Sequence, residues 1–172
     1  AIAIALAGCQ PDNSNKNQTQ TDQQVTSKAE HVNPLFSEFT TPRGIPPFDK
    51  IKKSDYLPAF EQSIIENKKE INAIADATNE ATFTNTIEAM EKSGDFLNRV
   101  SNVFYGLTGS MSDDEMRSIA KAVSPKLSAL NDDINLNANL FARVKAVYDK
   151  KEQLNLKVNE LTLLEKTYKD FV

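Results

Sequence analysis

The chain has 172 residues, and its 20 basic and 24 acidic side chains give a formal net charge of −4. This length suits one domain with a hydrophobic core, and the lack of a basic stripe argues against a nucleic-acid-binding protein. A single cysteine has no partner for an intrachain disulfide, so packing must stabilise the fold.

The first nine residues are typical of the end of a bacterial lipoprotein signal peptide. An apolar run, Ala1 to Ala7, leads through Gly8 to Cys9, and an apolar segment that ends in small residues marks a cleavage point. The run is too short for a membrane span, which needs about 20 apolar residues. We therefore expect Cys9 to be lipidated and the protein to lie on the cell envelope, at the periplasmic side of a membrane or at the outer membrane. The alternative is a stray apolar end with a free thiol.

Residues 10–32 are predicted to form a disordered polar linker. Gln, Asn, Thr, Ser, Asp and Lys dominate this stretch, which also contains His31, the one histidine of the sequence. Such a composition cannot bury enough apolar surface to offset the entropy that ordering would remove. An anchor followed by a linker would hold a folded domain near a membrane while leaving it in water.

Residues 33–172 are predicted to be all-α, beginning with a proline-rich strap. Prolines disfavour the helical conformation of the residue before them, so the strap should lie across the domain. The side chains expected to hold it are Leu35, Phe36, Phe39 and Phe48. A helix should then begin at Lys53, with Ser54 as its cap and Pro58 in its first turn.

Apolar residues at helical spacing predict the buried faces of the next three helices. In the first helix they are Leu57, Phe60, Ile64, Ile71 and Ile74. In the second they are Phe83, Ile87 and Met90, and in the third Leu97, Val100, Phe104 and Leu107. Gly94 should mark a bend between the second and third helices.

A longer helix is predicted from Met116 to Tyr148. Ser112 and Glu115 have the spacing of a capping box at its start. Pro125 should kink or break it, and Asn137 occupies the one polar position of the apolar register. A two-stranded coiled coil is the alternative, but the two interruptions favour packing inside a helical domain.

The last predicted helix keeps its apolar spacing from Val158 to Phe171, without a residue that would close it. Because an apolar face rarely accumulates up to the end of a domain, this pattern predicts that the sequence is part of a larger protein, cut inside a helix.

The sequence offers few candidates for catalysis. A zinc site or a nucleophile pair needs histidine or cysteine near other ligands or bases, whereas His31 lies in the linker and Cys9 at the anchor. The acidic residues that could be imagined as metal ligands are Asp113, Asp114, Glu115, Asp132 and Asp133. Helix-dipole compensation and solvated helix faces explain them better. We therefore predict no catalytic, cofactor-binding or metal-binding residue in this chain.

Three segments resemble a known family. They are DYLPAFE at residues 55–61, FTNTIEAMEKSG at residues 83–94 and NLFARV at residues 139–144. Their order resembles the N-terminal region of bacterial peptidyl-dipeptidases in the thimet oligopeptidase family of zinc peptidases, and the resemblance extends from Asn33 to Val172.

The resemblance implies a larger all-helical enzyme in which residues 33–172 form part of the wall of a substrate channel. It also implies short peptides as substrates, release of C-terminal dipeptides, and zinc held by an H-E-x-x-H motif and a further glutamate. None of those catalytic positions falls within this chain, so the chain alone should bind no zinc and be inactive. A monomer is expected at full length. The alternative is a stand-alone helical envelope lipoprotein that binds a partner without catalysis.

Overall fold

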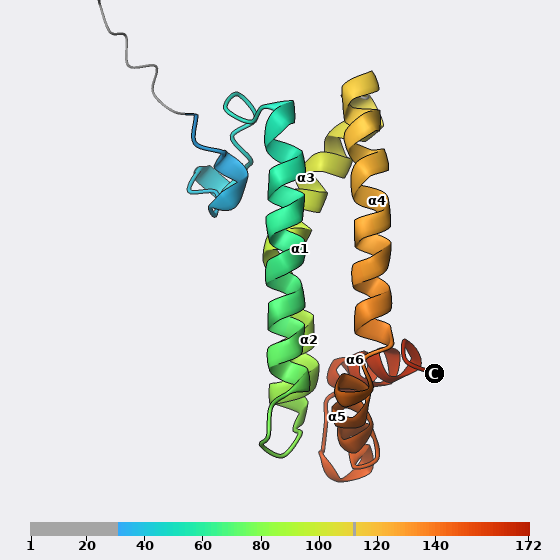
Figure 1. Ribbon diagram of the computed structural model, residues 1–172. Helices are drawn as coiled ribbons and strands as arrows, with labels where there is room; N and C mark the ends of the chain where they lie inside the picture. Colours follow the sequence, from blue (N-terminus) through green and yellow to red (C-terminus); the bar gives the residue numbers. More distant parts are fainter. Residues whose placement is uncertain (1–30, 112) are drawn as a thin grey trace, which may run out of the picture. The chain divides into compact units, whose positions relative to one another are not determined.

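The computed structural model describes residues 31–111 and 113–172. Residues Val32–Val172 form one compact unit, and all regular secondary structure among the described residues is helical, which confirms the all-α prediction (Figure 1). The predictions for the signal peptide, for Cys9 and for linker residues 10–30 lie outside the described residues. No described helix has the length and apolar character required to cross a membrane.

The unit contains short helical turns and six α-helices among its described residues. The turns are η1 (Pro34–Phe36), η2 (Pro42–Gly44), η3 (Phe83–Glu88) and η4 (Lys151–Gln153). The α-helices are α1 (Lys53–Ala75), α2 (Ala89–Lys92), α3 (Asp95–Met111), α4 (Asp114–Asn135), α5 (Ala138–Tyr148) and α6 (Val158–Lys169). Helix α1 packs against both α3 and α4, and α5 packs against α6 (Figure 1).

Fewer side chains of the proline-rich strap are buried than the sequence predicts. Leu35 is fully buried in the core and Phe39 packs against it. Phe36 and Phe48 are each about half exposed, at 47% and 49%, so they lie at the edge of the core, and Phe36 holds the strap by packing edge-on against Phe96 of α3. Asn33 adds a polar anchor, because its Nδ2 donates to the backbone oxygen of Asp55 at 2.8 Å.

Helix α1 begins at Lys53 as predicted, but Ser54 does not cap it. The carboxylate of Asp55 accepts a hydrogen bond from the backbone N–H of Lys52 at 2.7 Å. A negative charge in the first turn also suits the positive end of the helix dipole. Ser54 is exposed; the N-cap position is Lys52, and Asp55 contributes as the third residue of the helix by binding back to it.

The main core lies between α1, α3 and α4. Its aromatic centre is an edge-to-face pair of Phe60 and Phe104, whose ring centroids are 5.4 Å apart, and Tyr56 also packs edge-on against Phe104 at 5.1 Å. Val100 and Val123 close this core from α3 and α4 with no exposed surface. Edge-to-face packing of this kind adds to the free energy of burying the rings.

The predicted long helix is interrupted at a different place from the one expected. Pro125 lies inside α4 without ending it, whereas the chain breaks between Asn135 and Ala138. Asn137 is the cap of α5, and its side-chain oxygen accepts from the backbone N–H of Leu140 at 3.0 Å. The polar position in the register is therefore a helix start.

The start of α4 also differs from the prediction. Ser112 lies outside the described residues, and the side chain of Asp113 caps the helix by accepting from the backbone N–H of Met116 at 3.0 Å. Helix α6 ends at Lys169, so the expectation of helix up to Val172 is wrong. Phe171 instead stacks on Phe141, with ring centroids 5.7 Å apart.

Candidate functional site

Four of the five acidic residues considered as metal ligands, all except Asp132, take part in helix caps or ion pairs. The carboxylate of Asp113 contacts the Lys53 ammonium group in addition to capping α4, and these hydrogen bonds lower the pKa of that carboxyl group. Asp133 pairs with Lys68 at 2.6 Å, and Asp114 pairs with an arginine on its own helix. Among residues 31–111 and 113–172, no group of three His, Cys, Asp or Glu side chains could hold a metal ion.

His31, at the start of the described residues, is exposed. The described residues offer no set of ligands that fits the zinc implied by the resemblance, so they support no zinc-dependent step. The prediction that the zinc ligands lie in another part of the protein stays a prediction, as does the lipidation of Cys9.

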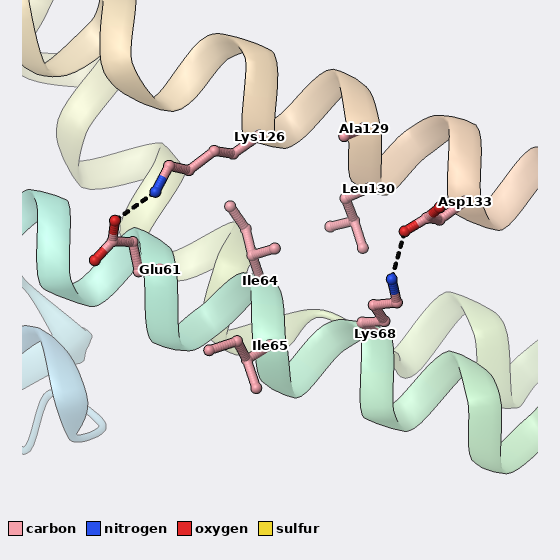
Figure 2. Close-up of a pocket in the computed structure, with 8 residues that line it drawn as sticks. All are labelled: Glu61, Ile64, Ile65, Lys68, Lys126, Ala129, Leu130 and Asp133. Atoms are coloured by element: carbon pink, nitrogen blue, oxygen red, sulfur yellow. Dashed lines mark hydrogen bonds and ion pairs between the residues drawn. The ribbon is translucent and has the colours of Figure 1, made fainter.

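A groove between α1 and α4 is a candidate binding surface. It has a volume of about 430 Å³ and is lined by Glu61, Ile64, Ile65, Lys68, Lys126, Ala129, Leu130 and Asp133. Figure 2 shows the aliphatic side chains of Ile64 and Leu130 between the two helices. Ile65 is 61% exposed, so the groove presents apolar surface to solvent.

Two ion pairs bridge the α1–α4 groove (Figure 2). Lys126 contacts Glu61 near one end, and Lys68 contacts Asp133 at 2.6 Å near the other. All four side chains are about half exposed, so each pair contributes about 1 kcal/mol or less to stability. Since its charged groups are paired with each other and its floor is aliphatic, the groove can bind apolar side chains.

Arg143 of α5 fixes the loop between α1 and η3. Only 8% of the residue is exposed. Its Nη1 donates to the backbone oxygens of Ala77 and Asn79, both at 2.8 Å. Its Nη2 donates to the side-chain oxygen of Asn85 at 3.0 Å, with a longer contact to Thr86 at 3.4 Å. One guanidinium group thereby ties α5 to a loop about 60 residues earlier in the chain.

Gly94 sets the angle between α2 and α3. Its φ of +76° lies in the left-handed region that favours glycine. A Cβ atom there would lie 2.1 Å from Nδ2 of buried Asn67, and the glycine N–H donates to the Glu70 carboxylate at 2.7 Å. The bend predicted at Gly94 is confirmed, and its cause is a close approach to α1.

Neither the contacts of Arg143 nor the α1–α4 groove was predicted from the sequence. Arg143 occurs in the NLFARV segment that carries the family resemblance, but nothing local signals that its partners lie in another loop. The groove contains Leu130 and also Ile64, which the helical spacing predicted as a core position. Ile64 is only partly buried, because α1 and α4 do not fully cover each other's apolar faces.

Comparison with known proteins defines the family relation. No protein-family model matches the chain. Over 141 residues, which are 82% of the chain, it is 39% identical to a dipeptidyl carboxypeptidase of Salmonella typhimurium and 38% identical to one of Escherichia coli. The chain spans about a fifth of the length of these relatives, 21% in each case. It is thus homologous to part of these dipeptidyl carboxypeptidases, which confirms the resemblance to bacterial peptidyl-dipeptidases.

Proposed function

We propose that the protein containing this chain is a zinc-dependent peptidase that releases dipeptides from the C-terminus of short peptides. The observation that carries this proposal is 39% identity to a dipeptidyl carboxypeptidase over 141 residues. Identity at this level over so long a stretch indicates a common fold, so the relatives' activity is the best guide to this protein's activity.

The helical unit would contribute shape and rigidity to that enzyme. Two features support this role: the packed core between α1, α3 and α4, and the Arg143 contacts that fix α5 against the loop after α1. We infer that the unit forms part of the wall of a channel that admits short peptides. Zinc and the residues that activate water would come from another part of the protein.

The sequence also supports a lipid-anchored form of such an enzyme. Cys9 follows an apolar run and precedes a polar linker, a design that would hold the helical unit outside the bilayer. One acyl chain binds a membrane only weakly, whereas two or three bind it stably. Mass spectrometry of the mature protein should find acyl chains on Cys9, and Cys9→Ser should abolish them. An unmodified cysteine would reject the anchor.

The peptidase proposal is tested with the complete gene product that contains this sequence. It should bind about one zinc ion per chain and release C-terminal dipeptides from an N-blocked tetrapeptide, and a chelator should stop the release. The 172-residue chain, assayed in parallel, should release none. A complete product that binds no zinc and cleaves no peptide would overturn the proposal.

A non-catalytic helical lipoprotein that binds a partner is the second candidate. The observation that favours it is the exposed apolar surface of the α1–α4 groove. The same assay separates the two candidates, because only the peptidase requires an H-E-x-x-H motif and a chelator-sensitive activity. The variant Ile65→Glu, which places a charge on the groove, should weaken partner binding and leave peptidase chemistry intact.

A further inference from the structure

Arg99 of α3 is held between two aromatic rings. Its guanidinium carbon lies 5.0 Å from the ring centroid of Phe96 and 5.9 Å from that of Phe39 in the strap. Phe36 packs edge-on against Phe96, with centroids 6.1 Å apart. Stacking on aromatic faces restricts a guanidinium group without using its N–H donors. The side chain is therefore held in place while its hydrogen-bonding capacity is unused.

The guanidinium group of Arg99 makes no hydrogen bond or ion pair with the residues that the structure describes. Its Nε is buried without a partner, as is the Nε of Arg143, so the two arginines differ in the contacts of their Nη atoms. Arg117, in contrast, pairs with Asp114 at 2.5 Å, and Arg143 has several oxygen partners. A partly buried arginine with unused donors is costly unless a ligand satisfies it.

Two surface hollows meet at Arg99. One, of about 400 Å³, is lined by Phe36, Gln62, Glu66, Phe96 and Arg99. The other, of about 520 Å³, is lined by Arg99 together with Glu38, Phe39, Gly44, Pro46, Asp95, Asn98, Asn102 and Val103. The cation thus lies where a ligand that entered either hollow would reach it.

The acidic side chains of the two hollows restrict what Arg99 could bind. Glu66 accepts from Gln62 Nε2 at 3.0 Å, Asp95 is at the start of α3, and Glu38 is exposed. The two hollows thus combine one cation with several carboxylate and amide oxygens. A suitable ligand brings a carboxylate to Arg99 together with N–H donors that the acidic and asparagine side chains can accept.

We propose that Arg99 binds a carboxylate group of a short peptide. The two N–H groups along one edge of the guanidinium would hold both carboxylate oxygens, an apolar side chain of the peptide would lie on Phe36 and Phe96, and peptide N–H groups would face Glu38 or Asn98. The carboxylate could be a peptide C-terminus or an acidic side chain. The choice of a peptide as ligand rests on the proposed function, but the contact is a binding contact and requires no catalysis.

The experiment measures binding by the 172-residue chain, so its failure leaves the peptidase activity of the complete protein untouched. The probes are the tetrapeptide Ala-Phe-Ala-Ala as a free acid, the same peptide as a C-terminal amide, and an amide form with Glu in the third position. Binding is followed by the NMR signal of the Arg99 Nε–H group. The free acid should shift this signal and bind about tenfold more tightly than the plain amide.

The third peptide identifies the source of the carboxylate. If the amide that contains Glu binds as well as the free acid, Arg99 accepts acidic side chains, and if it binds like the plain amide, Arg99 selects the C-terminus. Equal binding of the free acid and both amides, or no binding up to about 10 mM, would overturn the proposal.

Three variants separate recognition from folding. Arg99→Gln should remove the preference for a carboxylate, and Arg99→Lys should retain a smaller preference, because an ammonium group lacks the forked geometry. Arg117→Gln, which removes the same charge from an exposed part of α4, should leave the preference unchanged. If Arg99→Gln folds, as judged by its helical circular dichroism, and still prefers the free acid, the assignment to Arg99 is wrong. If Arg99→Gln does not fold, Arg99→Lys decides: a smaller preference supports the assignment, and an unchanged preference overturns it.

Discussion

Arg143 and Arg99 both lie partly or fully inside the helical unit, yet one is surrounded by hydrogen-bond acceptors and the other by aromatic rings. Arg143 donates to backbone oxygens of the loop after α1 and to Asn85. Arg99 lies between Phe39 and Phe96 without an oxygen partner among the described residues. The same side chain therefore serves as a structural link in one region and remains available to a ligand in the other.

The difference follows from what each arginine faces. Arg143 faces a loop whose backbone oxygens have no helical partners, and a guanidinium group can satisfy several of them at once. Arg99 contacts the rings of Phe39 in the strap and Phe96 in its own helix, and no acidic side chain of its two hollows hydrogen-bonds to it among the described residues. Loss of Arg143 should consequently affect folding, and loss of Arg99 should mainly affect binding.

The largest effect on stability is expected for Arg143→Leu. The substitution removes the donors for the oxygens of Ala77 and Asn79, and we expect the free energy of unfolding to fall by about 2–3 kcal/mol. Urea denaturation followed by circular dichroism measures this change. The matched variant Arg99→Leu breaks no hydrogen bond and should lower the free energy of unfolding by less than about 1 kcal/mol. Similar losses in both variants would contradict the comparison.

A smaller effect is expected for Gly94→Ala, which alters the turn before α3, the helix that carries Arg99. Gly94 precedes α3, and alanine there would combine a positive φ with a close contact to Asn67. We expect the free energy of unfolding to fall by about 1–2 kcal/mol. Adding Asn67→Ala should recover the part that is due to the contact but not the part that is due to φ. A stable Gly94→Ala variant would mean that the bend does not require glycine.

Asn137→Ala removes the cap of α5, the helix that carries Arg143. The backbone N–H of Leu140 would lose its partner, and a lost cap lowers the free energy of unfolding by about 1 kcal/mol. Asn137→Asp, which can also cap, should retain most of the stability. The thermal midpoints of the two variants measure the difference, and an alanine variant as stable as the aspartate variant would rule out the cap.

The smallest effect concerns the Lys53–Asp113 pair, which contacts neither arginine. The lysine ammonium group and the Met116 N–H lower the pKa of Asp113. Its contribution to stability is therefore present at neutral pH and is lost as the pH falls through the lowered pKa of the folded state. Asp113→Asn retains a capping side chain without the charge. Its urea midpoint should lie slightly below that of the parent chain at pH 7, and the two should converge as the pH falls below 3.8, the ordinary pKa of an aspartate.

The sequence by itself determined the helices and the family. Apolar residues at intervals of three and four positions mark the buried faces because that spacing is a property of the helix itself. Phe60, Ile71, Val100 and Phe104 are all buried as their spacing predicts. The three segments that carry the family resemblance are likewise contiguous in the chain.

Only the tertiary structure decided where the long helix breaks and which side chains cap the helices. Pro125 is exposed, so the backbone oxygen that loses its bond to the proline lies on the water side of α4 and the helix continues through it. Asn137, in contrast, lies where the chain must turn so that α5 can pack against α1 and α6. A local pattern that shows a polar residue in an apolar register cannot tell these two cases apart.

The functions of the two arginines also depended on tertiary contacts. Arg143 meets Ala77, which is 66 positions away, and Arg99 meets Phe39, which is 60 positions away in the numbering of the chain. Periodicity reports only on neighbours within about two helical turns, so it carries no information about such partners. The sequence thus determined which faces are buried, and the packing of distant segments decided which arginine has oxygen partners and which can bind a ligand.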